Sequence, residues 1–138
     1  IKKYLGGNFM KLNLNVNLEE AILLSNVLKR MDVNFIQSRI HKYEMDNMGI
    51  ENIRMGIKRI IKFINNFDKE FEIFYEDAVQ LMEWLGFQDM DDTQELMGIS
   101  IVTYEDEMRL DNIDSVICRL YGDLLRSIKR YKLNGGEI

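Results

Sequence analysis

The longest regular pattern in the chain is an apolar stripe that runs from Leu110 to Tyr131. Its members recur at intervals of three, four and seven residues, which places them on one face of a helix of about six turns. They are Leu110, Ile113, Val116, Ile117, Leu120, Tyr121, Leu124, Leu125, Ile128 and Tyr131. Asp111 and Asp114 are expected at the start of this helix, where its dipole favours carboxylates. Because one helix cannot bury such a stripe alone, the other segments should pack against it.

Strict alternation of apolar and polar residues over 11–18 predicts a half-buried β-strand. The even positions from Leu12 to Leu18 are apolar, and the odd positions between them are polar. The expected partner is 98–104, because that segment is rich in β-branched residues. Two strands are marginal by themselves, so the ribbon should rest on helices or pair across a subunit boundary.

Capping signals and helical periodicity predict further helices between these two features. They are expected over 18–31, 33–43, 50–67 and 69–86. A further helix near 96 is either a single turn or continues through the residues assigned to the second strand. The N-cap residues expected for them are, in chain order, Asn17, Asp32, Asp46, Asp68 and Asp92, of which Asn17 and Asp92 form capping boxes with Glu20 and Glu95. The predicted fold class is therefore α+β and predominantly α-helical, with five or six helices packed around a long C-terminal helix and a small two-stranded β-ribbon.

A chain of 138 residues suits one domain, and we expect a single globular domain over 10–138. Residues 1–9 are either a leader that precedes a start at Met10 or a short N-terminal arm. No apolar run approaches the roughly 20 residues that span a bilayer. Cys118 is the only cysteine, which excludes an internal disulfide and favours a cytoplasmic protein.

The net charge of −5 conceals a strong asymmetry along the chain. Residues 1–66 hold 11 Lys and Arg against 6 Asp and Glu, whereas residues 68–114 hold fifteen acids against Lys69 and Arg109 alone. Such a split points to interaction surfaces more than to fold. A pI near 5.0 argues against a dedicated nucleic-acid binder, so no direct nucleic-acid binding is expected despite the four cations of the 50–67 helix.

The familiar signatures of catalysis and metal binding are missing from the sequence. His41 has no second histidine at helical spacing, and no glycine-rich phosphate loop or nucleophile elbow is present. A calcium loop that began at Asp89 would need Gly and Glu where Gln94 and Ser100 stand. No catalytic residue, cofactor or metal ligand is therefore assigned.

Helical carboxylates support an alternative function as an enzyme. Asp92 with Glu95 and Asp111 with Asp114 are pairs at i,i+3, and Glu72 and Glu76 lie one turn apart if 69–86 is helical. The two pairs distantly resemble the E-x-x-E…E-x-x-D pattern of all-α nucleoside triphosphate pyrophosphohydrolases, although three of the four acids are Asp. The resemblance implies Mg²⁺-dependent hydrolysis by metal-activated water.

The preferred hypothesis is a non-catalytic protein-interaction module, a small cytoplasmic regulator or inhibitor. Its acidic band would dock on a basic surface of a partner protein, with aromatic side chains as anchors. The predicted contact residues are Glu83, Trp84, Phe87, Asp89, Asp91, Asp92, Glu95, Tyr104, Glu105, Asp106 and Glu107. The richness in Lys, Ile and Asn suggests an AT-rich genome, so a phage-encoded inhibitor fits. The third hypothesis is a structural homo-oligomer in which the basic first half of one chain meets the acidic second half of a neighbour. Separately, pairing of the ribbon edge across a two-fold axis would give a homodimer.

The alternating segment gives a direct test of burial. Leu14→Asp and Val16→Asp should each lower the free energy of unfolding by several kcal/mol, because each places a charge in an apolar layer. Urea denaturation of both variants measures the effect. Two variants that unfold at the parent's urea concentration would show that this segment is not half-buried.

Overall fold

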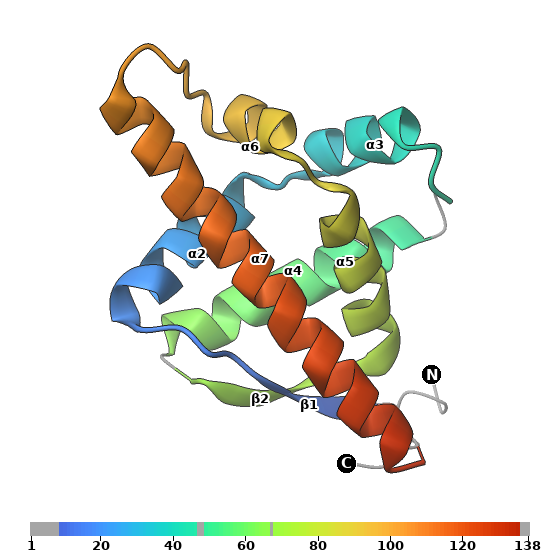
Figure 1. Cartoon of the computed structure of the whole chain (residues 1–138). Helices are drawn as coiled ribbons and strands as arrows, with labels where there is room; N and C mark the ends of the chain where they lie inside the picture. Colours follow the sequence, from blue (N-terminus) through green and yellow to red (C-terminus); the bar gives the residue numbers. More distant parts are fainter. Residues whose placement is uncertain (1–8, 47–48, 67, 136–138) are drawn as a thin grey trace.

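We describe a computed structural model of residues 9–46, 49–66 and 68–135. The described residues form six helices and two strands: β1 (Phe9–Asn13), α2 (Leu18–Arg30), α3 (Val33–Lys42), α4 (Ile50–Asn65), β2 (Glu70–Phe74), α5 (Tyr75–Phe87), α6 (Met90–Met97) and α7 (Tyr104–Leu133). The predicted class, a mostly helical α+β fold with a long C-terminal helix, is confirmed (Figure 1). None of these helices is both long and apolar enough to span a membrane.

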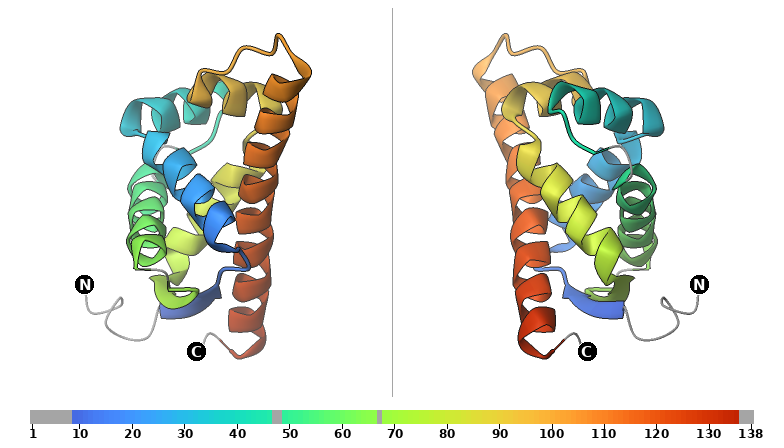
Figure 2. Two further views of the ribbon diagram at one scale, coloured as in Figure 1. Left: turned by 90° about the vertical axis from the view of Figure 1, so that its left-hand side faces the viewer. Right: turned by 90° about the vertical axis from the view of Figure 1, so that its right-hand side faces the viewer.

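The helices are arranged in layers, with the long helix α7 as one outer layer. Figure 2 shows α7 on one side and α4 on the other, with α2 and α5 between them. The β-ribbon closes one end of this stack, and α3 and α6 close the other (Figure 1). The stripe predicted on α7 faces inward, from Leu110 to Ile128, and contacts α2, α5, α6 and β1. The position of each of these elements in the fold therefore follows from the part of the α7 stripe that it covers.

The predicted partner of the first strand is wrong. β1 pairs antiparallel with β2, with Met10 opposite Ile73 and Leu12 opposite Phe71. The segment Glu70–Phe74 alternates exposed and buried residues, a period of two that a helix over 69–86 does not explain. The pairing puts four large side chains into the core, and α5 begins only at Tyr75. The prediction for residues 1–9 falls largely outside the described residues, and Phe9 itself opens β1.

The alternating pattern continues beyond β1 without further strand pairing. Leu14 and Val16 are buried, as predicted, and the Leu14 N–H donates to the Lys69 carbonyl at 2.7 Å. The Asn15 N–H donates to a carboxylate oxygen of Asp123 on α7 at 2.9 Å. Asp123 is itself buried and pairs with Arg126 on the next turn. A side chain of α7 therefore replaces the missing strand partner.

Two of the five predicted helix caps are confirmed, and the other three are wrong. Asn17 and Glu20 form the expected capping box, and Asp32 caps α3. Asp46 does not cap α4, whose N-cap is Gly49. Asp68 does not cap α5, whose N-cap is Phe74. The box of α6 is Asp89 with Asp92, three residues earlier than predicted, so Asp92 lies inside the helix.

The start of α7 also lies earlier than its apolar stripe indicates. Thr103 is the N-cap and forms a capping box with Asp106, so Asp111 and Asp114 lie in the second and third turns. The expected strand at 98–104 is absent. Gly98, at φ 65°, ends α6 in a Schellman motif in which the Ile99 N–H donates to the Gln94 carbonyl at 3.1 Å. Ile99 then enters the core as the apolar contact of that motif.

One buried carboxyl in the core forms no ion pair with any residue that the structure describes. Asp77 is in the first turn of α5, where that helix meets α4. Burial raises its pKa to about 6, the Arg59 charge opposes this rise, and the Glu76 charge adds to it. Close approach of the two helices depends on Gly56, since a Cβ there would lie 3.3 Å from the Asp77 carbonyl oxygen.

The raised pKa of Asp77 makes stability depend on pH. The folded protein binds a proton here more tightly than the unfolded chain does, so this contribution to stability is present below pH 4 and is lost as pH rises through 6. Asp77→Asn should therefore raise the free energy of unfolding at pH 7 by about 1–3 kcal/mol and by progressively less toward pH 4. Urea denaturation of both proteins from pH 4 to 8 measures the difference. A constant difference over this range would contradict the assignment.

Candidate functional site

The acidic segment predicted as a partner surface forms the end of the molecule opposite the β-ribbon. It consists of α6, the connection 98–103 and the start of α7, with α3 lying beside α6 (Figure 1). Ile99 anchors the connection to the core. Carboxylates from α6 and from the start of α7 therefore gather at this end, although the chain uses them in different ways.

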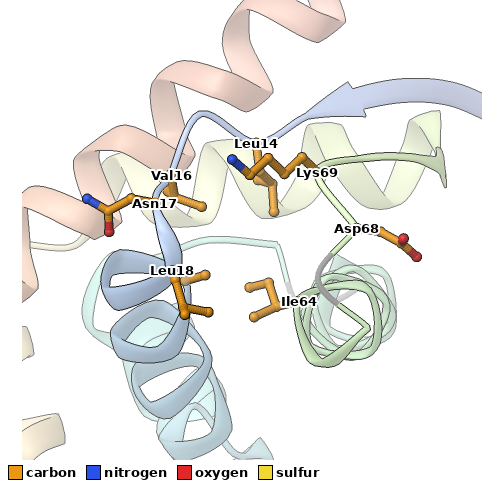
Figure 3. A pocket seen from close by; sticks show the side chains of 8 residues that line it. Leu14, Val16, Asn17, Leu18, Ile64, Asp68 and Lys69 are labelled. Carbon is orange, nitrogen blue, oxygen red and sulfur yellow. The ribbon is translucent and has the colours of Figure 1, made fainter.

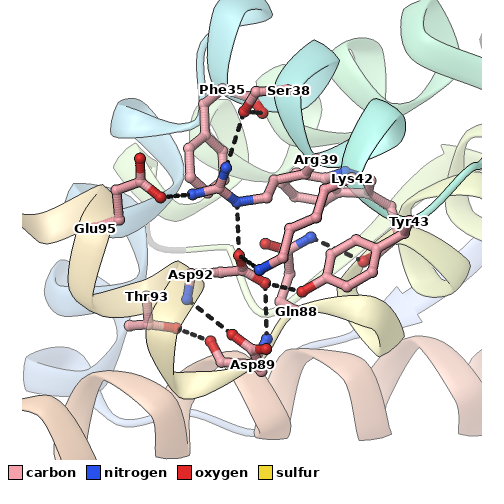
Figure 4. A network of polar contacts seen from close by, with 11 residues as sticks. Phe35, Ser38, Arg39, Lys42, Tyr43, Gln88, Asp89, Asp92, Thr93 and Glu95 are labelled. Atoms are coloured by element: carbon pink, nitrogen blue, oxygen red, sulfur yellow. Dashed lines mark hydrogen bonds and ion pairs between the residues drawn. The ribbon is translucent and has the colours of Figure 1, made fainter.

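Asp92 is the centre of a polar network that fastens α3 to α6 (Figure 4). Its side chain is 1 % exposed, and its Oδ1 lies 2.7 Å from Arg39 Nε and 2.9 Å from Lys42 Nζ. Its Oδ2 accepts hydrogen bonds from the Tyr43 hydroxyl and from the Asp89 N–H. Three hydrogen-bond donors and the Arg39 guanidinium charge converge on one carboxylate, so its charge is well compensated.

The same network includes the other contacts of Arg39. Its guanidinium pairs with Glu95 on α6, donates to the Ser38 hydroxyl at 3.0 Å and lies 4.5 Å from the centre of the Phe35 ring. Phe35 meets Trp84 of α5 edge-on, with 6.0 Å between the ring centres. Aromatic and charged contacts together hold α3 in place.

The electrostatics of Asp92 fit a carboxylate that stays ionised. Burial raises its pKa, but the hydrogen bonds from Tyr43, Lys42 and the Asp89 N–H, together with the Arg39 charge, outweigh burial and lower the pKa below the usual range. The hydrogen bond to Asp92 is the largest cause that raises the pKa of Lys42. For Tyr43, burial and then the Asp92 hydrogen bond raise the pKa. The network is therefore a structural device with fixed charges at neutral pH.

The connection 98–103 and the start of α7 present apolar side chains to solvent. Four of them lie within eight residues, and we name them the apolar strip: Ile101, Val102, Tyr104 and Met108. Val102 is 83 % exposed and Tyr104 is 74 % exposed. The cap fixes the backbone beneath them, because Asp106 accepts the N–H groups of Val102 and Thr103 at 3.1 and 3.0 Å. These bonds lower the pKa of Asp106, so the cap persists at neutral pH.

Carboxylates surround the apolar strip. Glu105 and Glu107 alternate with it in the first turn of α7, and both are exposed. On α6, Asp91 and Glu95 line a shallow hollow that Ile99 of the connection also borders. An exposed apolar group among like charges is the composition of a docking surface more than of a catalytic cleft.

The predicted contact residues divide into three groups. The prediction is wrong for Trp84 and Asp92. Trp84 is 0 % exposed in the core, and the charge of Asp92 is compensated within the network. Phe87, Asp89 and Glu95 are exposed but engaged: the Phe87 ring lies 5.6 Å from the Tyr43 ring, Asp89 caps α6, and Glu95 pairs with Arg39. Asp106 is likewise a cap.

Only part of the predicted set remains free at this end of the fold. The exposed members without a structural role in the contacts described above are Glu83, Asp91, Tyr104, Glu105 and Glu107. Glu83 stands apart on α5, whereas the last three share the first turn of α7.

Sequence reasoning missed three members of the apolar strip: Ile101, Val102 and Met108. The first two looked like strand residues, because β-branched side chains are enriched in strands. A usable signal was present in α7. Tyr104 and Met108 are four residues apart and share one face of α7. This face is not the one that carries the buried stripe from Leu110 and Ile113, and its next position is the polar Asp111.

The carboxylate pairs of the hydrolase alternative have separate surroundings. Asp92 and Glu95 contact α3, whereas Asp111 is exposed on α7. Among the described residues, no group of three or more His, Cys, Asp or Glu side chains is arranged to hold a metal ion. Cys118 is exposed beside Asp114, and burial, followed by that charge, raises the pKa of its thiol. A raised pKa makes this thiol a weak nucleophile.

The network around Asp92 predicts different roles for two neighbouring acids. Asp92→Asn should lower the free energy of unfolding by roughly 2–4 kcal/mol, because it removes the buried one of the two carboxylates that compensate Arg39 and leaves only the exposed Glu95. Asp91→Asn, on the exposed side of the same turn, should change it by less than about 0.5 kcal/mol. Urea denaturation at pH 7 compares the two. Equal stability of both variants would show that the network contributes nothing to holding α3.

Comparison of this chain with protein-family models, with curated proteins and with solved structures found no match. The functional conclusion therefore depends on the geometry and chemistry of the residues themselves.

Proposed function

We propose that this protein is a non-catalytic protein-binding module, which docks the start of α7 and the adjoining connection on a basic surface of a partner protein. The observation that carries the proposal is the apolar strip, which is exposed among carboxylates on a backbone fixed by the Thr103 and Asp106 cap. A regulator or inhibitor of the partner is the class of activity that such a module supports.

The two components of this surface have different roles in binding. Tyr104 and Val102 provide apolar area that loses contact with water, and an exposed tyrosine is a frequent centre of interface energy. Glu105 and Glu107 provide charge that steers a basic partner and determines orientation more than affinity. The contact therefore combines a short-range apolar component with a long-range electrostatic one.

The partner is best sought among proteins that handle nucleic acid. Such proteins carry clusters of Lys and Arg that neutralise phosphates. A surface that presents carboxylates at the same site competes for those clusters. The acidic residues not used in caps or in the Asp92 network supply this charge.

The test is a binding experiment with matched variants. The immobilised protein should retain a basic protein from an extract of its source cells, and the association rate should fall steeply as salt rises. Tyr104→Ala should weaken binding to that protein by roughly tenfold or more. Leu133→Ala removes an equally exposed apolar side chain at the other end of α7 and should leave binding unchanged.

A charge reversal separates this surface from the wider acidic band. Glu107→Lys should slow association, whereas Glu83→Lys, which makes the same change on α5, should not. Surface plasmon resonance with the purified partner measures both rates. Binding that survives Tyr104→Ala and high salt would contradict the proposal.

A further inference from the structure

A second surface lies on the seam between α2 and α4, away from the acidic end. Two hollows adjoin there at Ile64, one of about 250 Å³ and one of about 160 Å³. Leu18 and Ile22, one turn apart on α2, border them and are 57 % and 51 % exposed. Apolar exposure beside a concave surface is unusual for a side chain with no function, which makes the seam a candidate binding site.

The larger hollow is apolar. Figure 3 shows Leu18 of α2 and Ile64 of α4 facing each other across it, with Leu14 and Val16 above them. Ala21 completes the lining on α2. Such a surface suits an aliphatic chain, because it offers contact area with few groups that require hydrogen bonds.

The smaller hollow has both apolar and polar lining residues, and it borders an unsatisfied group. Ser25, Asn26 and Lys29 of α2 line it together with Asn65 at the end of α4. The Ser25 hydroxyl is buried and has no hydrogen-bond partner in the described part of the chain. Lys29 makes no ion pair with any described residue. The Ser25 oxygen has almost no exposed surface in this rotamer, so a ligand acceptor would bind it once the side chain rotates toward the hollow, and the new hydrogen bond would satisfy a group that otherwise costs stability.

We propose that this seam binds a medium-chain aliphatic carboxylate, with its chain in the apolar hollow and its carboxylate among Ser25, Asn26, Lys29 and Asn65. Charge determines the orientation. Lys69 borders the apolar hollow, but Asp68 stands beside it and opposes an anion, whereas Lys29 lines the smaller hollow without any acid. Ala21 and Ser25 lie one turn apart on α2, so a short chain reaches from one hollow into the other.

Isothermal titration with decanoate tests the proposal on the full chain. A saturable one-to-one complex is expected, and decylamine and butyrate should bind far more weakly because the first has the wrong charge and the second lacks the chain. Amide shifts in the ¹⁵N spectrum should cluster at residues of the two hollows. The absence of saturable binding up to the solubility of decanoate overturns the proposal.

Variants identify the two ends of the site. Ala21→Phe fills the apolar hollow and should abolish binding, while Lys29→Gln should weaken it roughly tenfold. Arg30→Gln makes the same charge change on the adjacent exposed residue, outside both hollows, and should have no effect. Unchanged binding by Lys29→Gln, or an equal loss in Arg30→Gln, overturns the assigned orientation.

Ser25→Ala distinguishes a binding role from a structural one. It removes an unsatisfied hydroxyl from a helix, so the melting temperature should not fall, yet binding should weaken roughly threefold. Sedimentation of the free protein serves as a further control. A dimer that Ala21→Phe dissociates would assign the seam to a second copy of the chain and would overturn the proposal.

Discussion

The apolar stripe of α7 is the constraint on which the remaining elements depend. It begins at Leu110 and continues to Ile128, and α2, α5, α6 and β1 each cover part of it. The helix itself begins at Tyr104, because its cap and not its stripe determines where it starts. Its first turn therefore has no core to face, and this mismatch between cap and stripe leaves Tyr104 and Met108 exposed.

Acidic residues in this protein have two distinct roles, which composition alone conceals. Asp89, Asp92 and Asp106 form caps or the network to α3, so their charges are compensated by backbone N–H groups or by cations from the basic half of the chain. Asp91 and Glu107 have no such role in the contacts described here. The asymmetry of charge along the chain is therefore partly an internal attraction between α3 and α6 and partly a surface property.

The two proposed surfaces are physically different and lie on different elements. The apolar strip belongs to the connection 98–103 and the start of α7 and is exposed beside carboxylates, which suits another protein with complementary charge. The seam is concave and belongs to α2 and α4, which suits a small amphiphilic molecule. Neither surface uses the Asp92 network, so variants at either surface should leave the packing of α3 intact.

The sequence by itself determined the helices and their order, because caps and 3.6-residue periodicity are local. Asn17 with Glu20, Asp32 and the stripe of α7 were all identified from spacing alone. Strand pairing is not local, so the sequence did not identify the partner of β1. The β-branched residues of 98–104 were a stronger local signal for a strand than Glu70–Phe74, although Glu70–Phe74 alternates. Burial of Trp84 and Asp92 was likewise decided by the tertiary structure, since side chains of α3, distant in sequence, pack against both. The apolar strip arose in the same way, because an exposed side chain is defined by what fails to pack against it.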